Sequence, residues 1–330
     1  MSIHKYPYPV PAGDMQLLRL PGLNPEDVIL DEQGRVLCGL EDGSIVRMNA
    51  DGSDAVVVAN TGGRPLGLEW LPDGRLLVCD CLLGLLAVDL SNQAVEVLVD
   101  SVNGKKLMIC NNASVAKDGT IYFSDSSKRY LLTKIQSDII EHIATGRLLR
   151  RNVDGSVDVL LENLQFANGV VLAPDESFVL VAQTGGGKIN RVWLKGAKAG
   201  QHDMFADNLP GLPDNLSLGS DGLIWLAMPS ATDFRLKIIH RLPTIVRRLI
   251  ARLSEMLPVA EMRNVLLMAF NTDGECVHFV EGDPLRFHLV TGVREHNGKL
   301  YVGSVEESAV AVMPVPLALP RWKTTLAAHY

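Results

Sequence analysis

The chain has 330 residues, of which 47% are hydrophobic and 21% are charged, so it carries ample apolar material for a folded core. Its formal net charge of −7 argues against a nucleic-acid partner, because it supplies no broad basic surface to contact phosphates. Residues 1–16 include no apolar stretch typical of a signal peptide, and no run approaches the roughly 18 apolar residues of a membrane span.

The five cysteines are odd in number and irregularly spaced. They indicate reduced thiols in a cytoplasmic protein rather than a disulfide framework. Cys79 and Cys81 stand at strand spacing without a second pair, and we interpret them as buried apolar side chains rather than a metal or redox site.

A strand-like run, a tight turn and a second strand-like run recur six times along the chain. The six turn positions are Gly34, Gly74, Gly119, Glu176, Gly222 and Gly298. Glycine suits such turns because it adopts positive φ without steric cost. A further strand pair follows each hairpin, as in GSIVRMNADGS or GRLLRRNVDGSVDVLL. We therefore predict an all-β fold, a six-bladed β-propeller of four-stranded blades, as a single domain over 1–330 with blades from about 24 to 316.

Two gaps between hairpins are long, one after the third turn and one after the fifth. The second gap contains apolar residues at helical spacing between Pro243 and Pro258, which can begin and end a helix. We expect a helical insertion over about 236–262 that, with residues near 127–145, forms a lid over the tunnel mouth.

Three arginines mark the other face of this predicted helix, Arg247, Arg248 and Arg252. Contact with a membrane surface is one interpretation of that face. A solvated outer surface of the lid explains the charges as simply, and it is the interpretation favoured by the sequence.

Counting back eight residues from each turn gives one position per inner strand: Glu26, Leu66, Asn111, Asn168, Asp214 and Val290. Because the inner strands of a propeller run side by side along the tunnel, these positions should form a ring. Four of them carry oxygen, and none is Cys or His, which is the ligand set that Ca²⁺ prefers. The next residues add Asp27, Asn112 and Asn215 as further ligands or as supporting contacts. Strand capping alone is the alternative explanation for single Asn and Asp residues.

Several stretches carry a family resemblance: TIYFSDSSKRY, GRLLRRNVDGSV, FANGVVLAPDESFVLVAQT, VWLKGAKAGQHDMFADNLPGLPDN and VREHNGKLYVGS. The chain resembles the calcium-dependent lactonase and phosphotriesterase propellers, which include gluconolactonases, regucalcins, paraoxonases and diisopropylfluorophosphatases. It is more similar still to the strictosidine-synthase-like branch with the adipocyte plasma-membrane-associated proteins. The resemblance runs from about Glu26 to about Pro314. It implies a catalytic calcium bound by residues that match Glu26, Asn111, Asn168 and Asp214, with Asn215 matching an additional ligand of paraoxonase-like members.

The chain departs from the family pattern at two positions. Asn112 stands where an aspartate usually follows the first asparagine, so one negative charge is missing. Thr291 occupies the place of a catalytic glutamate in plant strictosidine synthases, which argues against Pictet–Spengler chemistry. The histidines attributed to paraoxonase catalysis have no match.

These observations predict a calcium-dependent hydrolase of a small ester, most simply a lactone, with phosphotriester hydrolysis as a promiscuous activity. Asp214 is the predicted general base or nucleophile. The ends of the returning strands should line the substrate pocket, at Asp80, Ser126, Ser127, Thr184, Met228 and Glu306. The alternatives are a non-catalytic scaffold with structural calcium, or a strictosidine-synthase-like protein with different chemistry that uses another acid such as Glu306 or Glu295.

Overall fold

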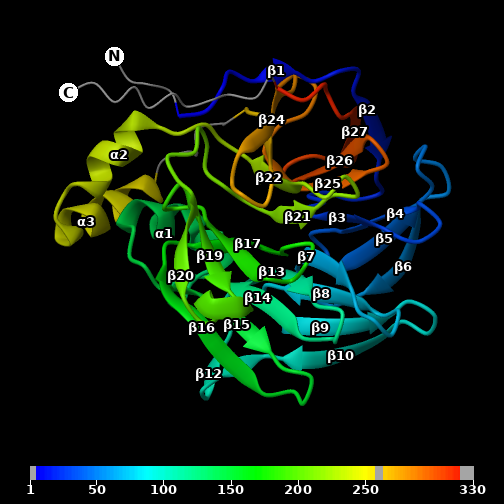
Figure 1. The fold of residues 1–330 in the computed structure, drawn as a ribbon, viewed down its shortest axis with the longest axis horizontal. Helices are drawn as coiled ribbons and strands as arrows, with labels where there is room; N and C mark the ends of the chain where they lie inside the picture. Colours follow the sequence, from blue (N-terminus) through cyan, green and yellow to red (C-terminus); the bar gives the residue numbers. More distant parts are fainter. Residues whose placement is uncertain (1–4, 257–262, 320–330) are drawn as a thin grey trace.

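The computed structural model describes residues 5–256 and 263–319. In this part of the chain six four-stranded antiparallel units are arranged as a ring of blades around a central axis (Figure 1). The six-bladed propeller predicted from the sequence is therefore confirmed. Each of the six repeated turns has positive φ, including Glu176 at 56°.

The blades follow one another in chain order, and the first strand of each lies innermost. Blades 1 and 2 consist of β3 (Val28–Leu30), β4 (Val36–Gly39), β5 (Ser44–Met48) and β6 (Val56–Asn60), then β7 (Pro65–Trp70), β8 (Leu76–Asp80), β9 (Gly84–Asp89) and β10 (Ala94–Val99). Blades 3 and 4 consist of β13 (Cys110–Val115), β14 (Ile121–Asp125), β15 (Gly146–Arg151) and β16 (Val157–Leu164), then β17 (Ala167–Leu172), β18 (Phe178–Gln183), β19 (Lys188–Trp193) and β20 (His202–Ala206). A small hairpin, β11 (Ser101–Val102) and β12 (Lys105–Lys106), separates blades 2 and 3.

Blades 5 and 6 both recruit N-terminal residues. Blade 5 consists of β21 (Leu216–Leu218), β22 (Ile224–Met228), β23 (Leu266–Phe270) and β24 (Cys276–Glu281), with β1 (Val10–Pro11) added in parallel to β24. Blade 6 consists of β25 (Val290–His296), β26 (Lys299–Ser304), β27 (Ala309–Pro314) and, as its outermost strand, β2 (Gln16–Arg19). The blades therefore include residues from Val10 onward, and not only from about residue 24 as the sequence predicted. The sequence did not reveal β1 and β2 because neither strand has a hairpin partner close in the chain.

Six clusters of buried apolar side chains fill the six interfaces between neighbouring blades. Each sheet is covered on both faces by its neighbours, which is why the second strands read as almost continuous apolar runs, such as Phe178–Gln183. All five cysteines are free thiols; Cys79 and Cys81 are buried, as the sequence indicated. Leu18 of β2 belongs to the cluster between blades 6 and 1, where it packs with Tyr301 and Val310.

The described residues of the two long insertions form three α-helices. Helix α1 (Ile135–Glu141) follows a 3₁₀ turn between β14 and β15, whereas α2 (Phe234–His240) and α3 (Thr244–Ser254) lie between β22 and β23. Pro243 precedes the first residue of α3, as predicted. The predicted end of the insertion, residues 257–262, lies outside the described residues. The three helices are gathered at one side of the ring (Figure 1).

The contribution of β2, the outermost strand of blade 6, can be tested by mutation. We expect Leu18→Ala to lower the free energy of unfolding by about 2–4 kcal/mol, because it removes buried methyl groups and leaves a cavity between blades. Arg19→Ala, at the neighbouring exposed position of β2, should change it by less than about 0.5 kcal/mol. Urea unfolding measures both, and equal stability of the two variants would show that β2 does not hold the ring closed.

Candidate metal centre

A repeated irregularity distinguishes the tunnel end of the inner strands. In β7, β13, β17 and β25 the pairing with the second strand is interrupted for two residues, at 66–67, 111–112, 168–169 and 291–292. In blade 5 the Asp214 amide donates to Ala227, and the Ala227 amide donates to Asn215. At each of these places two residues of the inner strand lie opposite one residue of the second strand. This arrangement is a β-bulge, and it changes the direction in which the side chains of the bulge point.

The bulges correct one member of the predicted ring. The eight-residue count selected Val290, but the bulge of blade 6 begins at Thr291. The last hairpin is one residue shorter, because His296 pairs directly with Lys299 across a two-residue turn. The equivalent positions are therefore Glu26, Leu66, Asn111, Asn168, Asp214 and Thr291. The Thr291 hydroxyl is buried and donates to the Glu26 carbonyl oxygen at 2.7 Å.

At the residue that directly follows each ring position, glycine alternates with Asp or Asn from one blade to the next. A Cβ atom on Gly67 would lie 2.7 Å from the Asn111 carbonyl oxygen, and one on Gly169 would lie 2.3 Å from the Leu216 amide nitrogen. A Cβ on Gly292 would meet the Glu26 carbonyl oxygen at 2.7 Å. Neighbouring inner strands therefore touch backbone to backbone at this level, and only glycine fits at three of the contacts.

Two of the intervening residues fasten one blade to the next. Asp27 accepts a hydrogen bond from the Leu68 amide at 3.0 Å, and Asn112 Oδ1 accepts one from the Val170 amide at 2.8 Å. These oxygens are used in blade-to-blade contacts, so the structure gives Asp27 and Asn112 a supporting role rather than that of ligands. A hydrogen bond from a backbone amide needs an acceptor oxygen but no negative charge, so the amide side chain of Asn112 is sufficient at this position.

Four buried side-chain oxygens of the ring have no hydrogen-bond partner among the residues that the structure describes, namely Oδ1 of Asn111, Asn168, Asp214 and Asn215. A buried oxygen without a donor costs about 1–3 kcal/mol, so four in one place are unusual in a stable protein. All four are acceptors, and a positively charged group can satisfy them together.

The three amide groups are oriented by hydrogen bonds on their nitrogen side. Asn111 Nδ2 donates to Ser126 Oγ at 3.1 Å, and Asn168 Nδ2 donates to Thr184 Oγ1 at 3.1 Å. Asn215 Nδ2 donates to Glu26 Oε2 at 3.1 Å. Because each nitrogen is engaged, each carbonyl oxygen is left available, and the orientation of the amide is fixed before any ligand arrives.

Two carboxyl groups stand among these oxygens. Burial raises the pKa of Asp214 to about 8, with the nearby charge of Asp27 acting in the same direction. Burial also raises the pKa of Glu26 well above its usual range, and the proximity of Asp214 raises it further. Ionising both together is therefore unfavourable, since desolvation and mutual repulsion outweigh the opposing charge of Arg64 near Glu26. The ring therefore combines two ionisable carboxyl groups with the buried oxygens of three amides.

The predicted pocket residues fall into different environments. Ser126 and Thr184 contact the ring directly, as the acceptors for Asn111 and Asn168. Asp80 is fully buried and accepts hydrogen bonds from Thr61 and from the backbone of its own turn, and Met228 is fully buried in the interface of blades 4 and 5. The structure therefore places neither of these two on the rim of a pocket.

The other two predicted pocket residues contact the insertion and the last blade. Ser127 donates to Asp138 of α1 at 2.5 Å and accepts from the amides of Arg129 and Tyr130, so it anchors the start of the insertion. Glu306 is exposed, and its Oε2 lies 3.1 Å from His288 Nε2. Glu295, considered above as an alternative acid, is buried and accepts hydrogen bonds from Ser220 and Gly298.

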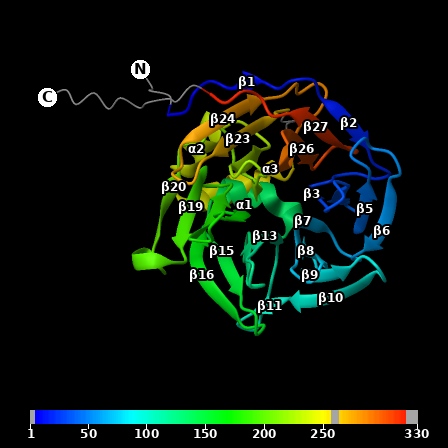
Figure 2. The same cartoon turned by 45° about the vertical axis from the view of Figure 1, so that its right-hand side comes forward.

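The helices lie at the end of the tunnel where the ring is found. Ile139 of α1 packs against a buried cluster that contains Leu66, a ring position, and Phe166, the residue before β17. In the view of Figure 2, α1 and α3 lie across the middle of the ring of blades. The predicted lid over the tunnel mouth is therefore built from both insertions.

Polar contacts hold the two insertions together. Glu255 accepts hydrogen bonds from Lys134 at 2.5 Å and from Ser137 at 2.7 Å. The rings of His142 and His240 stack at 3.7 Å between centroids, and burial lowers the pKa of both. The lid therefore consists of two insertions, one from blade 3 and one from blade 5, that are held together by contacts between their side chains.

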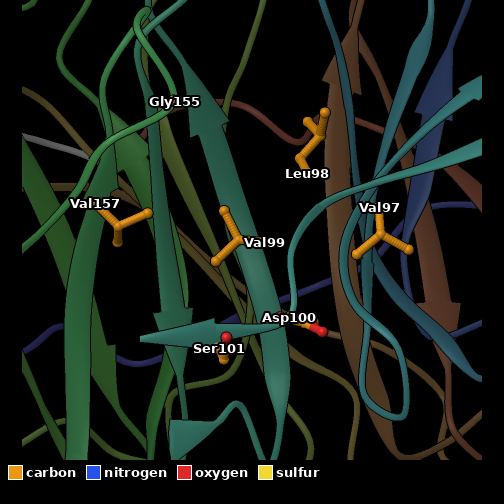
Figure 3. A pocket seen from close by; sticks show the side chains of 7 residues that line it. All are labelled: Val97, Leu98, Val99, Asp100, Ser101, Gly155 and Val157. Carbon is orange, nitrogen blue, oxygen red and sulfur yellow. The ribbon is translucent and has the colours of Figure 1, made fainter. Parts of the chain in front are cut away.

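A separate recess lies at the outer edge of blades 2 and 3 (Figure 3). It is lined by Val97, Leu98, Val99, Asp100, Ser101, Gly155 and Val157. These residues belong to the outermost strands and their loops, so the recess is not part of the ring. Among the described helices, none has the length and apolar composition needed to cross a bilayer.

Comparison with known proteins identifies the family. The strictosidine synthase profile matches residues 111–197, and the strictosidine synthase-like N-terminal profile matches residues 13–48. An adipocyte plasma membrane-associated protein from Salmo salar is 36% identical over 82% of this chain and 70% of its own length. Strictosidine synthase-like protein 6 of Arabidopsis thaliana is 32% identical over 87% of this chain and 78% of its own length.

Solved structures share the architecture at lower identity. A gluconolactonase from Xanthomonas campestris superposes with a TM-score of 0.66 at 18% identity, over 92% of this chain and 89% of its own. A calcium-binding regucalcin from Agrobacterium tumefaciens has a TM-score of 0.63 at 14% identity, over 94% and 98%. At these identities the likeness establishes the fold alone. On the evidence of its relatives, the chain belongs to the strictosidine synthase-like family that includes the adipocyte plasma membrane-associated proteins.

Proposed function

We propose that the protein is a calcium-dependent hydrolase of small esters, with a lactone as the preferred substrate class. The observation that carries the proposal is the ring of four buried oxygens, on Asn111, Asn168, Asp214 and Asn215, that have no partner among the described residues and lie beside the carboxyl group of Glu26. The shared fold of a gluconolactonase and a calcium-binding regucalcin supports it.

The residues present fit Ca²⁺ better than a transition metal. Glu26, Asn111, Asn168 and Asp214, with Asn215 beside them, would supply oxygen ligands only, and two of them can balance the charge of a divalent ion. Within residues 5–256 and 263–319, no three His, Cys, Asp or Glu side chains come together as a metal-binding group. A soft or nitrogen-rich site of the zinc type therefore finds no support in the described part of the chain.

Bound calcium would polarise the ester carbonyl and stabilise negative charge that develops on its oxygen. The chain itself must supply a base or a nucleophile, and Asp214 is the acidic ring residue with an unpaired Oδ1. As a base it removes a proton from the attacking water, and that proton passes to the alkoxide when the ester C–O bond breaks. As a nucleophile its carboxylate attacks the carbonyl carbon, the ester C–O bond breaks and the alkoxide takes a proton from water, and the resulting hydroxide then hydrolyses the acyl group from Asp214. Glu26 accepts a hydrogen bond from the Asn215 amide, so besides being a candidate ligand it positions the neighbouring Asn215 oxygen.

Thr291 bears on the alternative of carbon–carbon bond formation. Its hydroxyl is buried and engaged with the Glu26 carbonyl, so this position offers no free acid or base. Hydrolysis needs no group there, because the acidic residues of the ring lie on other blades. This difference favours the ester hydrolase over Pictet–Spengler chemistry.

We expect Asp214→Asn to reduce lactone turnover by about 10²–10⁴-fold while calcium still binds. The amide retains an oxygen for the ion but can act neither as base nor as nucleophile. Asn168→Asp is the matched control, since it keeps an oxygen and leaves Asp214 in place. Turnover and calcium affinity should be measured on both variants at saturating calcium. Near-normal turnover by metal-loaded Asp214→Asn would assign the catalytic carboxylate to another residue, and Glu26 and Glu306 would be examined next.

A non-catalytic scaffold with structural calcium makes a different prediction. It should show calcium-dependent stability but no calcium-dependent turnover of any lactone, aryl ester or phosphotriester. Screening these three substrate classes with calcium and with chelator separates the two functions.

The raised pKa values predict a pH dependence of the metal-free protein. Below about pH 4 the carboxyl group of Asp214 is protonated in both the folded and unfolded states. As pH rises towards its folded pKa of about 8, the unfolded state releases the proton and the folded state retains it. Stability in EDTA should therefore fall over this range, and excess calcium should abolish the fall by stabilising the ionised form.

Melting temperatures measured across this pH range, with EDTA and with calcium, check the prediction. Asp214→Asn has no titrating group at this position, so in EDTA it should show a shallower fall than the unmodified protein. Identical pH profiles with and without calcium would mean that no cation occupies the ring.

A further inference from the structure

A basic side chain stands beside apolar residues at the mouth of the tunnel. Arg64 directly precedes β7, two residues before the ring position Leu66. Its carbonyl oxygen accepts a hydrogen bond from the Cys81 amide at 3.0 Å. Leu66 and Cys81 belong to the buried cluster on which Ile139 of α1 packs. Arg64 therefore lies in blade 2 at the level between the ring and the lid.

The charge of Arg64 acts on the ring. Burial and the neighbouring carboxyl groups raise the pKa of Glu26, and the positive charge of Arg64 is one of the influences that oppose this rise. Burial also raises the pKa of Cys81 to about 12, with Asp80 acting in the same direction, and Arg64 again opposes it. Because the interaction of two charges weakens with their separation, the guanidinium lies close to both residues.

Arg64 lacks the kind of partner that other buried arginines have. Arg147 pairs with Asp125 at 2.9 Å. Arg294 pairs with Glu69 at 3.3 Å. Arg64 is half-buried, and its Nη1 atom is buried without a hydrogen-bond partner among the described residues. An arginine stays charged at every physiological pH, so a buried donor of this kind is costly until an acceptor binds it.

The carboxyl groups near Arg64 have other partners. Glu26 and Asp214 together balance the two charges of a calcium ion at the ring. Asp80 accepts hydrogen bonds from Thr61 and from two amides of its own turn. With calcium at the ring, the guanidinium is therefore a further positive charge beside a divalent cation. An anionic group of the ligand relieves this imbalance, because both cations attract it.

We propose that Arg64 binds a carboxylate of the substrate, so that the substrates are small lactones or esters that carry a carboxylate besides the bond that is hydrolysed. This inference rests on the proposed function of the ring. The planar guanidinium can hold a carboxylate through two parallel N–H donors, and its single charge matches that of the carboxylate. Holding the substrate by this group fixes the orientation of its ester carbonyl towards the ring.

The test compares two lactones of nearly equal shape: γ-butyrolactone with a carboxylate on its γ carbon, and the same ring with a carboxamide there. We expect the calcium-loaded protein to hydrolyse the carboxylate lactone with a kcat/KM roughly 10- to 100-fold higher. Arg64→Gln should lose this preference and keep the turnover of the carboxamide lactone within about twofold. Arg64→Lys retains the charge but not the paired donors, so it should restore part of the preference.

Binding of tetrahydrofuroate, a ring ether with the same carboxylate but no hydrolysable bond, gives a measurement that does not depend on turnover. Calorimetry on the calcium-saturated full chain should show that Arg64→Gln weakens this binding at least about tenfold. If the unmodified protein hydrolysed neither lactone, the proposed function would fail. Loss of tetrahydrofuroate binding in Arg64→Gln would still support Arg64 as a carboxylate-binding residue.

Arg151→Gln is the matched control. Arg151 is half-buried like Arg64, and its Nε also lacks a partner among the described residues. It pairs with Ile121 beside the Gly119 turn, at the end of the blade away from the ring. Its substitution should change neither the lactone preference nor the binding of tetrahydrofuroate.

Two results would overturn the proposal. Equal slowing of both lactones by Arg64→Gln would mean that the guanidinium does not recognise a substrate carboxylate. Unchanged binding of tetrahydrofuroate by Arg64→Gln would mean the same. Melting temperatures of Arg64→Gln and Arg64→Lys show that the proteins compared are folded, so that lost binding reports the missing guanidinium.

Discussion

The close approach of the six inner strands around the tunnel determines which residues can stand there. Where neighbouring backbones touch, Gly67, Gly169 and Gly292 are required, because a Cβ atom would lie under 3 Å from backbone atoms of the next strand. On alternate blades, Asp27 and Asn112 bridge the gap with a side-chain oxygen on the next blade's amide. The ring of candidate ligands therefore rests on a rigid, backbone-level frame.

This frame makes it physically reasonable for the protein to bury groups that destabilise it. The unpaired oxygens of three amides and of Asp214, together with the raised pKa of the Asp214 and Glu26 carboxyl groups, oppose folding, whereas the six apolar interfaces between blades favour it. A less constrained fold would relieve the cost by letting the amides turn to find donors. Here Ser126 and Thr184 hold the amide nitrogens of Asn111 and Asn168, so the oxygens stay oriented. The site is preorganised for a cation in this sense.

In the lid, apolar residues at helical spacing do not show by themselves whether they pack on a core or face outward. The apolar positions of α3 have the spacing of a helix that packs on a core, yet Ile245, Leu249 and Met256 are more than half exposed. The contacts that hold the lid are made instead by Glu255, His142 and His240 on its inner side. Amphipathic periodicity reports that a helix has two different faces, and the packing of α1 decides which one is covered.

The sequence by itself determined the architecture, because six hairpins at regular spacing with turns of positive φ are a local, repeated signal. It also placed Glu26, Asn111, Asn168 and Asp214 at one register, since that register follows from counting along strands. It could not locate β2, whose partner β27 is almost 300 residues away, nor could it recognise that Thr291 rather than Val290 completes the ring. Only the tertiary structure separated Asp27 and Asn112, which bind the backbone of the next blade, from Asn215, whose oxygen is free. It also placed Asp80 and Met228 in the interior. These distinctions depend on contacts between blades, and residues far apart in the chain leave no periodic trace of such contacts in the sequence.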